Sequence, residues 1–318
     1  MAKRKISAEA LSGVWSASPT PFTAKMQVDT VAVRKMVDHH IRLGVKGLFL
    51  AGTCGEGPWM TTAQHRTLVR TTSEHVSKLA AKDESKRLVL AVQVTDNSSA
   101  RILDNMHSAA EDGADIAVIA PPNFFMDPTA KRLTQHYAEA VAKSPLPVGL
   151  YDRGQYSSVA IPDAVFKEVV KNKKVCMVKD SSCDADRTKL FLSLRRKHNH
   201  IKLLTGYEFG CMDYLKAGYD GLLLGGGIIT GYMANQMVEA YRAGDVALAE
   251  KIEQRLNRVA FAAYGGKKIN CWLSGLKTLL VAMKVFRTAK TYFDQPVTAS
   301  CAKGIERLMQ KDIDVLLP

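Results

Sequence analysis

The segment Val175-Cys176-Met177-Val178-Lys179-Asp180-Ser181-Ser182 ends a short apolar run with a lysine. A valine-rich run bounded by polar turn-forming residues predicts a buried strand over Val175–Lys179. A lysine is almost never fully buried unless it is paired, and burial disfavours its charged form. A neutral amine in a pocket attacks carbonyl carbons, which is the first step of Schiff-base chemistry. The simpler interpretation is a lysine that reaches water or pairs with Asp180, and this segment taken alone favours it.

The same kind of apolar run recurs along the chain, and amphipathic stretches with helical spacing separate the runs. The other predicted strands are Val14–Ser18, Gly47–Ala51, Leu88–Val94, Asp115–Ala120, Pro147–Tyr151, Ile201–Thr205 and Asp220–Leu224. The helices predicted between them are Thr30–Leu43, Thr62–Leu79, Ser98–Glu111, Thr129–Ala142, Pro162–Val170, Asp184–Arg196 and Tyr207–Ala217. Eight strands, each followed by a helix, within roughly 240 residues match a (β/α)8 TIM barrel. A doubly wound sheet is the alternative, but the lack of a GxGxxG motif after the first strand argues against its dinucleotide-binding form.

The last quarter of the chain has a different pattern. From about residue 244 the strand signals stop, and three further helices are predicted at Asp245–Ala263, Trp272–Phe286 and Ala302–Leu316. Glycine and proline pairs mark the breaks between them. The sequence therefore predicts a barrel over residues 1–243, which holds the active site, and a C-terminal three-helix extension over residues 244–318.

Composition excludes several classes of protein. The chain has 318 residues, of which 47% are hydrophobic and 24% charged, as in ordinary globular proteins. No run of about eighteen apolar residues is present, so no membrane span is expected. Met1–Lys5 is basic but no apolar stretch follows it, so no secretory signal is expected there. The six cysteines form no CxxC pair, which favours reduced thiols in a cytoplasmic protein.

The net charge of +13 raises the question of a nucleic-acid partner. The basic residues are spread over the predicted helices, and no RRM, KH, zinc-finger or helix-turn-helix pattern is present. We therefore expect a basic, solvated surface with a weak preference for anionic substrates, and no nucleic-acid partner.

Residues at the carboxyl ends of the predicted strands are the candidates for chemistry, because active sites of such barrels lie there. The loop Gly52-Thr53-Cys54-Gly55 offers backbone amides and a hydroxyl that suit a carboxylate or phosphate, or it is a plain tight turn. Tyr151 can relay a proton, or it is a core tyrosine. With Lys179, these groups supply the nucleophile, proton shuttle and anion grip of a Schiff-base lyase. The run Gly225–Gly227 follows the eighth strand, where barrels often bind phosphate, although glycines there also suit close helix packing.

Four ordered motifs, Pro19–Phe22, Gly52–Glu56, Leu150-Tyr151 and Val178–Ser182, resemble those of a known superfamily. The chain resembles the dihydrodipicolinate synthase and N-acetylneuraminate lyase superfamily of class I aldolases over essentially its whole length. The resemblance implies that Lys179 forms an imine with a 2-keto acid, usually pyruvate, and that Tyr151 shuttles protons. It implies that Thr53 and the Cys54 amide bind the keto-acid carboxylate. It also implies a homotetramer built as a pair of dimers. No cofactor or metal is expected, because no cluster of histidines and carboxylates has ligand spacing.

Departures from the family pattern bear on the substrate. Cys54 replaces the second hydroxyl residue of the loop, and a thiol is a poor donor. Phe124 and Phe125 stand where the synthases have a tyrosine pair, so Phe125 occupies a position that relays protons across a subunit interface. Tyr156 lies near the usual place of a substrate-binding arginine, and Arg153 is displaced from it.

These changes argue against the lysine-pathway synthase itself. Glu208 resembles the polar position by which sialic-acid-type lyases hold hydroxyl groups, or it is a carboxylate favoured at a helix start. Four hypotheses stay open: a Schiff-base lyase or aldolase that acts on a 2-keto acid, dihydrodipicolinate synthase, a keto-acid-binding protein without turnover, and a phosphate-binding barrel.

Overall fold

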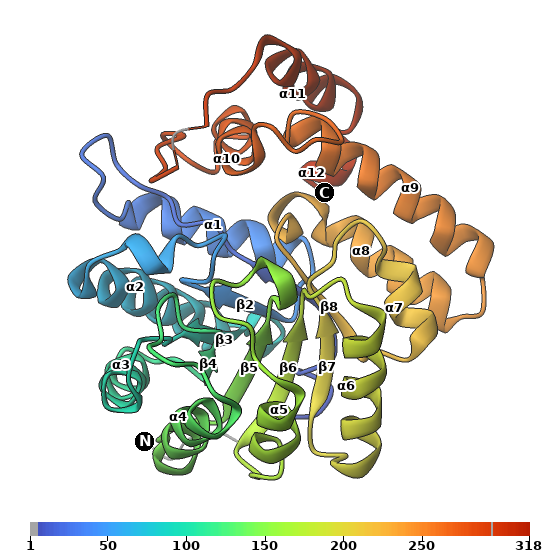
Figure 1. Cartoon of the computed structure of the whole chain (residues 1–318). Helices are drawn as coiled ribbons and strands as arrows, with labels where there is room; N and C mark the ends of the chain where they lie inside the picture. Colours follow the sequence, from blue (N-terminus) through green and yellow to red (C-terminus); the bar gives the residue numbers. More distant parts are fainter. Residues whose placement is uncertain (1–5, 294) are drawn as a thin grey trace.

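The computed structural model describes residues 6–293 and 295–318, so the expectation about Met1–Lys5 lies outside the described residues. Eight strands form a closed barrel in the order β1 to β8, and each pairs with its neighbours in parallel (Figure 1). The strands are β1 (Gly13–Ala17), β2 (Gly47–Leu50), β3 (Val89–Gln93), β4 (Ile116–Ile119), β5 (Val148–Asp152), β6 (Val175–Asp180), β7 (Lys202–Thr205) and β8 (Gly221–Leu224). The prediction of a TIM barrel is confirmed.

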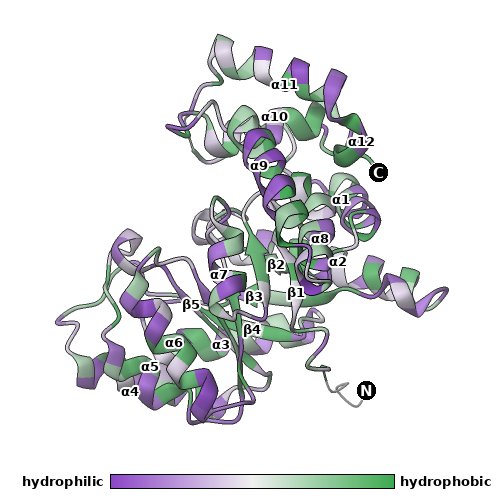
Figure 2. Cartoon of the chain, turned by 90° about the vertical axis from the view of Figure 1, so that its right-hand side faces the viewer, coloured by the Kyte–Doolittle hydropathy of each residue, from purple (hydrophilic) through white to green (hydrophobic). Residues whose placement is uncertain are grey.

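Helices connect the strands and surround the barrel. They are α1 (Thr30–Arg42), α2 (Thr62–Ala80), α3 (Ser99–Glu111), α4 (Ala130–Lys143), α5 (Asp163–Val169), α6 (Ala185–Lys197), α7 (Cys211–Ala217) and α8 (Gly227–Arg242). Short 3-10 turns lie at η1 (Gly57–Trp59), η2 (Glu84–Lys86) and η3 (Gly154–Tyr156). Nearly every strand residue is buried, as expected for parallel strands that helices cover on one face and barrel side chains on the other. Figure 2 shows largely hydrophobic strands, with hydrophobic and hydrophilic residues mixed along the surrounding helices.

Side-chain caps set the starts of several helices. Asp29 accepts hydrogen bonds from the amides of Val31 and Ala32 at the start of α1. Thr61 and Gln64 form a reciprocal capping box at the start of α2. Such caps satisfy amides that have no partner within the helix, typically worth about 1 kcal/mol each.

The C-terminal extension begins with α9 (Val246–Ala263) and α10 (Trp272–Ala282), followed by α11 (Ala299–Lys311) and α12 (Ile313–Leu316). Ala302–Leu316 was predicted as one helix, but the structure has two helices there that meet at Asp312, so the described extension has four helices rather than three. Helix α10 ends earlier than predicted, because Lys284 adopts a left-handed φ of 59°. Helices α10 and α11 lie over one end of the barrel (Figure 1).

One barrel helix also starts later than predicted. The prediction placed a helix over Tyr207–Ala217, but α7 begins at Cys211. The Tyr207 amide donates to Thr205 Oγ1 at 3.1 Å, which turns the chain out of β7 before the helix starts. This irregular segment carries Glu208 into the barrel mouth.

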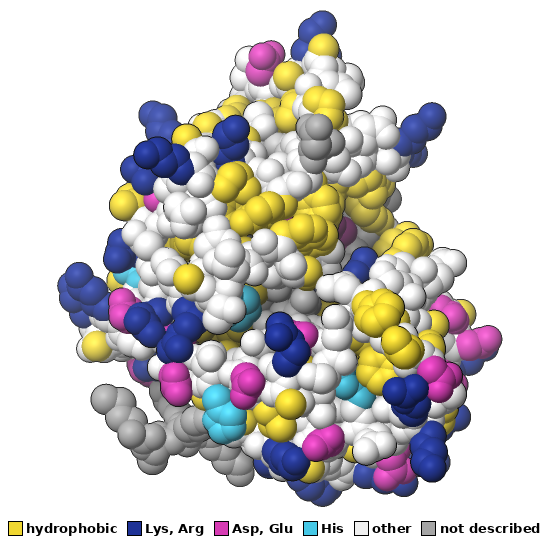
Figure 3. All heavy atoms as spheres, turned by 60° about the vertical axis from the view of Figure 1, so that its left-hand side comes forward, with side chains coloured by type: hydrophobic (Ala, Val, Ile, Leu, Met, Phe, Trp, Pro, Cys, Tyr) yellow, Lys and Arg dark blue, Asp and Glu magenta, His cyan; other side chains and the backbone are white. Residues whose placement is uncertain are grey.

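The distribution of charged side chains, the cysteines and the helices can each be compared with what the composition led us to expect. Lys and Arg side chains are scattered among acidic ones on the face shown in Figure 3, rather than gathered in one tract. All six cysteines are free thiols. In residues 6–293 and 295–318, no helix is both long and apolar enough to cross a membrane.

Candidate active site

Lys179 and Tyr151 lie side by side at the carboxyl ends of β6 and β5. Their Cα atoms are register partners across the two strands, and both side chains are buried, with 5% and 6% of their surface exposed. Lys179 Nζ lies 4.3 Å from the centroid of the Tyr151 ring and 5.0 Å from that of Phe49. The Phe49 and Tyr151 rings meet edge to face with centroids 5.8 Å apart. The amine is therefore held against two aromatic rings at the barrel mouth.

The backbone after β7 makes room for this lysine. A Cβ atom on Gly206 would lie 2.8 Å from Lys179 Cε and closer still to the Ser181 hydroxyl. Any larger residue at this position would have to displace the lysine chain. Glycine at 206 thus leaves room for both the lysine chain and the Ser181 hydroxyl.

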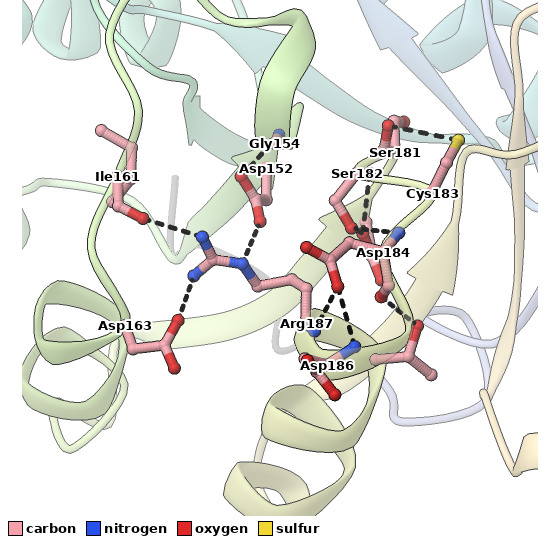
Figure 4. Close-up of polar contacts among 12 residues, drawn as sticks. Asp152, Gly154, Ile161, Asp163, Ser181, Ser182, Cys183, Asp184, Asp186 and Arg187 are labelled. Atoms are coloured by element: carbon pink, nitrogen blue, oxygen red, sulfur yellow. Dashed lines mark hydrogen bonds and ion pairs between the residues drawn. The ribbon is translucent and has the colours of Figure 1, made fainter.

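A buried ion pair fixes the end of β5, one residue beyond Tyr151. Arg187 in the first turn of α6 pairs with Asp152, with Nε and Oδ2 3.0 Å apart (Figure 4). The same guanidinium pairs with Asp163 at 2.9 Å and donates to the Ile161 carbonyl at 2.9 Å. Burial raises the pKa of Asp152, and the Gly154 amide and Arg187 oppose that rise. Arg187 therefore joins three segments at the edge of the site.

The end of β6 is fixed in a similar way. Asp180 Oδ1 accepts the Ser182 amide at 2.9 Å and hydroxyl at 2.7 Å, and its Oδ2 accepts the Tyr219 hydroxyl at 2.6 Å. Asp180 is fully buried. It therefore bonds to Tyr219 rather than to Lys179, and Lys179 is itself buried, so neither simpler interpretation, a lysine that reaches water or one that pairs with Asp180, describes this structure.

The loop after β2 turns back on itself at the mouth. Gly57 donates its amide to the Gly52 carbonyl at 3.2 Å, and Glu56 donates to the Thr53 carbonyl at 3.1 Å. Within the described part of the chain, the amides of Thr53 and Cys54 donate to no protein acceptor. The loop can therefore offer these donors to an anion.

Cys54 is part of this loop, but its thiol already bonds to another segment and is not free to bind an anion. Its Sγ donates to the Gly225 carbonyl at 3.4 Å, and burial raises the pKa of the thiol to about 12. The thiol is therefore neutral and serves as a packing group. Thr53 lines a cavity of about 330 Å³ together with Gln93, Asn123 and Arg153, and the lining of this cavity includes neither Lys179 nor Tyr151.

Glu208 bonds to the segment after β8 that Cys54 also contacts, and both of its carboxylate oxygens are bonded. Oε2 accepts the Gly226 amide at 2.7 Å, and Oε1 accepts the Tyr264 hydroxyl at 3.0 Å. Burial raises the pKa of Glu208, which Gly226, Tyr264 and the nearby charge of Lys179 oppose. Because Glu208 already uses the Gly226 amide, the glycine run after β8 gives no added support to the phosphate-binding hypothesis.

Two predicted site residues, Phe125 and Tyr156, form no hydrogen bond, ion pair or aromatic contact with Lys179 in the part of the chain that the structure describes. Phe125 packs edge to face on His136 of α4, with centroids 5.1 Å apart, and the Arg132 guanidinium lies over its ring. Tyr156 ends η3 and is 58% exposed. Their predicted roles, an interface relay position and a substrate contact, stay predictions.

Lys277, Tyr264 and Phe49 were not among the predicted site residues. Lys277 is fully buried on α10 and pairs with Glu56 of the loop. A lone lysine in the apolar stretch Trp272–Ala282 is the same signal that marked Lys179, so it could have been noticed. No local pattern marks Tyr264, since a tyrosine in an apolar helix is ordinary.

No group of three or more histidine, cysteine or acidic side chains is placed to hold a metal ion in residues 6–293 and 295–318. What the mouth does bring together is an amine, a phenol, free backbone amides and a buried carboxyl group.

A closed barrel with a buried lysine and tyrosine at adjacent strand ends has the architecture of a class I aldolase. The chain belongs to the Dihydrodipicolinate synthetase family, whose model matches residues 10–311. The resemblance drawn from the four sequence motifs is thus confirmed, and with it, at the level of this family, the prediction of a Schiff-base lyase.

Individual relatives fall into two groups. The chain is 26% identical to N-acetylneuraminate lyase 2 of Escherichia coli, over 96% of this chain and 92% of that one. It is 26% identical to the N-acetylneuraminate lyase of Salmonella typhimurium, over 97% and 96% of the two chains. Among solved structures, the dihydrodipicolinate synthase of Bacteroides thetaiotaomicron is similar in fold, with a TM-score of 0.83 and 22% identity over 94% and 98% of the chains. A prophage protein of this family from Escherichia coli, solved with pyruvate, has a TM-score of 0.80 and 20% identity over 94% and 98%.

Proposed function

We propose that this protein forms an imine between Lys179 Nζ and the carbonyl carbon of a 2-keto acid, pyruvate or a pyruvate-releasing hydroxy-keto acid. The observation that carries the proposal is the position of the Lys179 amine, buried 4.3 Å from the centroid of the Tyr151 ring on the adjacent strand. The presence of pyruvate in the solved prophage relative supports the same choice of substrate.

The reaction follows from the chemistry of the imine. The amine attacks C2 of the keto acid, the carbonyl oxygen leaves as water, and Tyr151 supplies and takes back the protons that this exchange requires. The protonated imine then accepts an electron pair. In the cleavage direction, Tyr151 takes the proton of the C4 hydroxyl of a 4-hydroxy-2-keto acid, the C3–C4 bond breaks, its electrons move into an enamine, and an aldehyde departs. The enamine then takes up a proton at C3, and water hydrolyses the imine to release pyruvate and the Lys179 amine. In the reverse direction, the enamine carbon attacks the aldehyde.

The carboxylate of the keto acid needs a fixed donor set, so that C2 faces the amine. We assign this role to the Thr53 hydroxyl and to the amides of Thr53 and Cys54, which have no protein acceptor in the part of the chain that the structure describes. Oriented amides of this kind bind anions without a charged side chain. The Cys54 thiol adds nothing to this grip, because it bonds to Gly225.

Borohydride reduction in the presence of pyruvate tests the proposal. Wild type should gain the mass of one reduced pyruvate adduct, mapped by peptide analysis to Lys179. Lys179→Ala should gain none, whereas Lys202→Ala, which removes a lysine from the neighbouring strand, should behave as wild type. An unmodified wild type, or an adduct that persists in Lys179→Ala, would refute the proposal.

The part of the substrate other than pyruvate distinguishes the two groups of relatives. Similarity to N-acetylneuraminate lyases favours a sugar-acid substrate, with Glu208 and Tyr156 near its hydroxyl groups. Similarity in fold to dihydrodipicolinate synthases keeps aspartate semialdehyde as the alternative. Two assays decide between these substrates: pyruvate release from a panel of sugar acids, and condensation of pyruvate with aspartate semialdehyde. A lysine adduct without turnover in either assay would indicate a keto-acid-binding protein.

Assembly and location belong to the same proposal. We infer a homotetramer in the cytoplasm, with the exposed Phe124 and the neighbouring Phe125 at a subunit contact. A monomeric dihydrodipicolinate synthase variant is also similar in fold, with a TM-score of 0.83 and 19% identity over 97% and 99% of the chains, so assembly must be measured directly. Analytical sedimentation of wild type would give the oligomeric state of the protein. A smaller assembly for Phe124→Ser than for wild type would place this loop at the subunit contact.

A further inference from the structure

The anion-binding loop after β2 ends in Glu56, and all partners of its carboxylate among the described residues come from the C-terminal extension. Glu56 is fully buried. Its Oε2 accepts Lys277 Nζ, while its Oε1 accepts the Thr291 hydroxyl at 2.6 Å and the Tyr292 amide at 2.7 Å. Residues more than 220 positions away in the chain thus hold one end of the loop.

Lys277 is itself an unusual residue for its place. It lies on α10 among apolar neighbours, with none of its side chain exposed. Besides Glu56, its Nζ donates to the Lys290 carbonyl at 2.7 Å and lies 4.5 Å from the centroid of the Phe22 ring. A buried ion pair is weak evidence for stability, because desolvation of both charges offsets much of their attraction. A role in setting local geometry explains the pair better.

The loop that Glu56 ends has a backbone that needs such support. Ala51 and Glu56 adopt left-handed φ angles of 54° and 58°, which non-glycine residues hold only where the surroundings enforce them. From the barrel side, Thr20 donates its hydroxyl to the Gly55 carbonyl at 2.6 Å. The loop is therefore held on one side by the segment that follows β1, and on the other side by the C-terminal extension.

We propose that Lys277 is a positioning residue for keto-acid binding: through Glu56 it holds the loop so that the Thr53 and Cys54 amides face the substrate carboxylate. This inference rests on the proposed function, which assigns the carboxylate to these amides. The extension is then part of the active site rather than an appendage beside it. Because Lys277 does not touch the reacting atoms, its loss should weaken substrate binding more than it slows the chemistry.

The test compares two variants with one control. Lys277→Met removes the charge, and Thr291→Val removes a neutral donor to the same carboxylate without leaving a buried charge unpaired. Arg255→Met is the control, because Arg255 pairs with Asp312 and Asp314 within the extension and does not contact the loop. For each protein, the pyruvate concentration that gives half-maximal borohydride trapping is measured, together with hydrogen–deuterium exchange of the amides in residues 52–57 without ligand.

We expect Lys277→Met to raise the half-saturating pyruvate concentration about tenfold with the same final extent of trapping, and Thr291→Val to raise it about threefold. Loop amides should exchange faster in both variants and at the wild-type rate in Arg255→Met. Unchanged saturation and exchange in Thr291→Val and Lys277→Met, or equal changes in Arg255→Met, would overturn the inference. If wild type traps no pyruvate, the proposed function fails, while the exchange measurement still decides whether Lys277 orders the loop.

Discussion

The Tyr264 hydroxyl donates to Oε1 of Glu208 at 3.0 Å, so the residue that closes α9 bonds directly to a carboxyl group in the barrel mouth. Tyr264 is fully buried, and Glu208 is 8% exposed. A Cβ atom on Gly226 would lie 2.6 Å from the Tyr264 oxygen, so the glycine makes this contact possible. Together with Lys277 and Glu56, this pair gives the extension a second point of attachment to the site.

Tyr264→Phe should destabilise the protein by about 1–3 kcal/mol, because a buried carboxylate oxygen loses its donor and gains no water. The matched control is Tyr137→Phe, since the buried Tyr137 hydroxyl has no hydrogen-bond partner among the described residues. Removing that hydroxyl should leave stability unchanged or raise it slightly. Urea unfolding of the three proteins measures the difference, and equal midpoints for Tyr264→Phe and wild type would contradict the prediction.

Glu208→Gln should change how stability depends on pH. Burial raises the folded-state pKa of Glu208 above the ordinary value near 4.5, so the folded state binds this proton more tightly than the unfolded chain does. The contribution of the group is then complete below pH 4.5 and is lost as pH rises through the raised pKa. Glutamine does not titrate, and its single Oε1 can accept the Gly226 amide while its NH2 group donates to the Tyr264 oxygen, which can also accept. The free energy of unfolding of the variant, relative to wild type, should therefore increase between pH 4.5 and pH 8; a constant difference would exclude the raised pKa.

Arg187→Met should cost about 3 kcal/mol of stability, because it leaves Asp152 buried without its cation. Lys189→Met, two residues further along α6, removes an exposed ion pair with Asp186 and should cost at most about 0.5 kcal/mol. The double variant Arg187→Met with Asp152→Asn should recover part of the loss, since no buried charge is left unpaired and Asp163, which also loses Arg187, is exposed. Chemical denaturation of the four proteins gives the comparison, and equal losses for Arg187→Met and Lys189→Met would show that the Asp152 pair adds nothing.

Cys54 should resist alkylation in the native protein. Its thiol is buried and its pKa is raised to about 12, so the thiolate that reacts is scarce at pH 8. Cys183, which is exposed, should react with iodoacetamide at least about a hundred times faster. Peptide mass analysis over time measures both rates. Rapid labelling of Cys54 in folded protein would mean that the loop opens.

Much of the barrel could be predicted because its signals are local. Apolar runs such as Val175–Lys179 and Gly47–Ala51 coincide with β6 and β2 to within a residue at each end. The rule that barrel sites lie at the carboxyl ends of strands then selects Lys179 and Tyr151, and these side chains do lie together. The predicted helix boundaries were wrong where the local chain departs from the helical pattern of the sequence. The bond from the Tyr207 amide to Thr205 delays the start of α7, and the last predicted helix is divided at Asp312.

The order of strands, the lysine at a strand end and the membership of an aldolase family were all readable in the chain itself, because each depends on residues close together in sequence. The contacts that complete the barrel mouth could not be predicted from the sequence. Glu56 with Lys277 and Glu208 with Tyr264 join residues 221 and 56 positions apart, and only the closed barrel with α9 and α10 folded against it brings them within hydrogen-bond reach. A buried charge depends on the partners that surround it in space, so its role is decided by tertiary packing rather than by any local pattern.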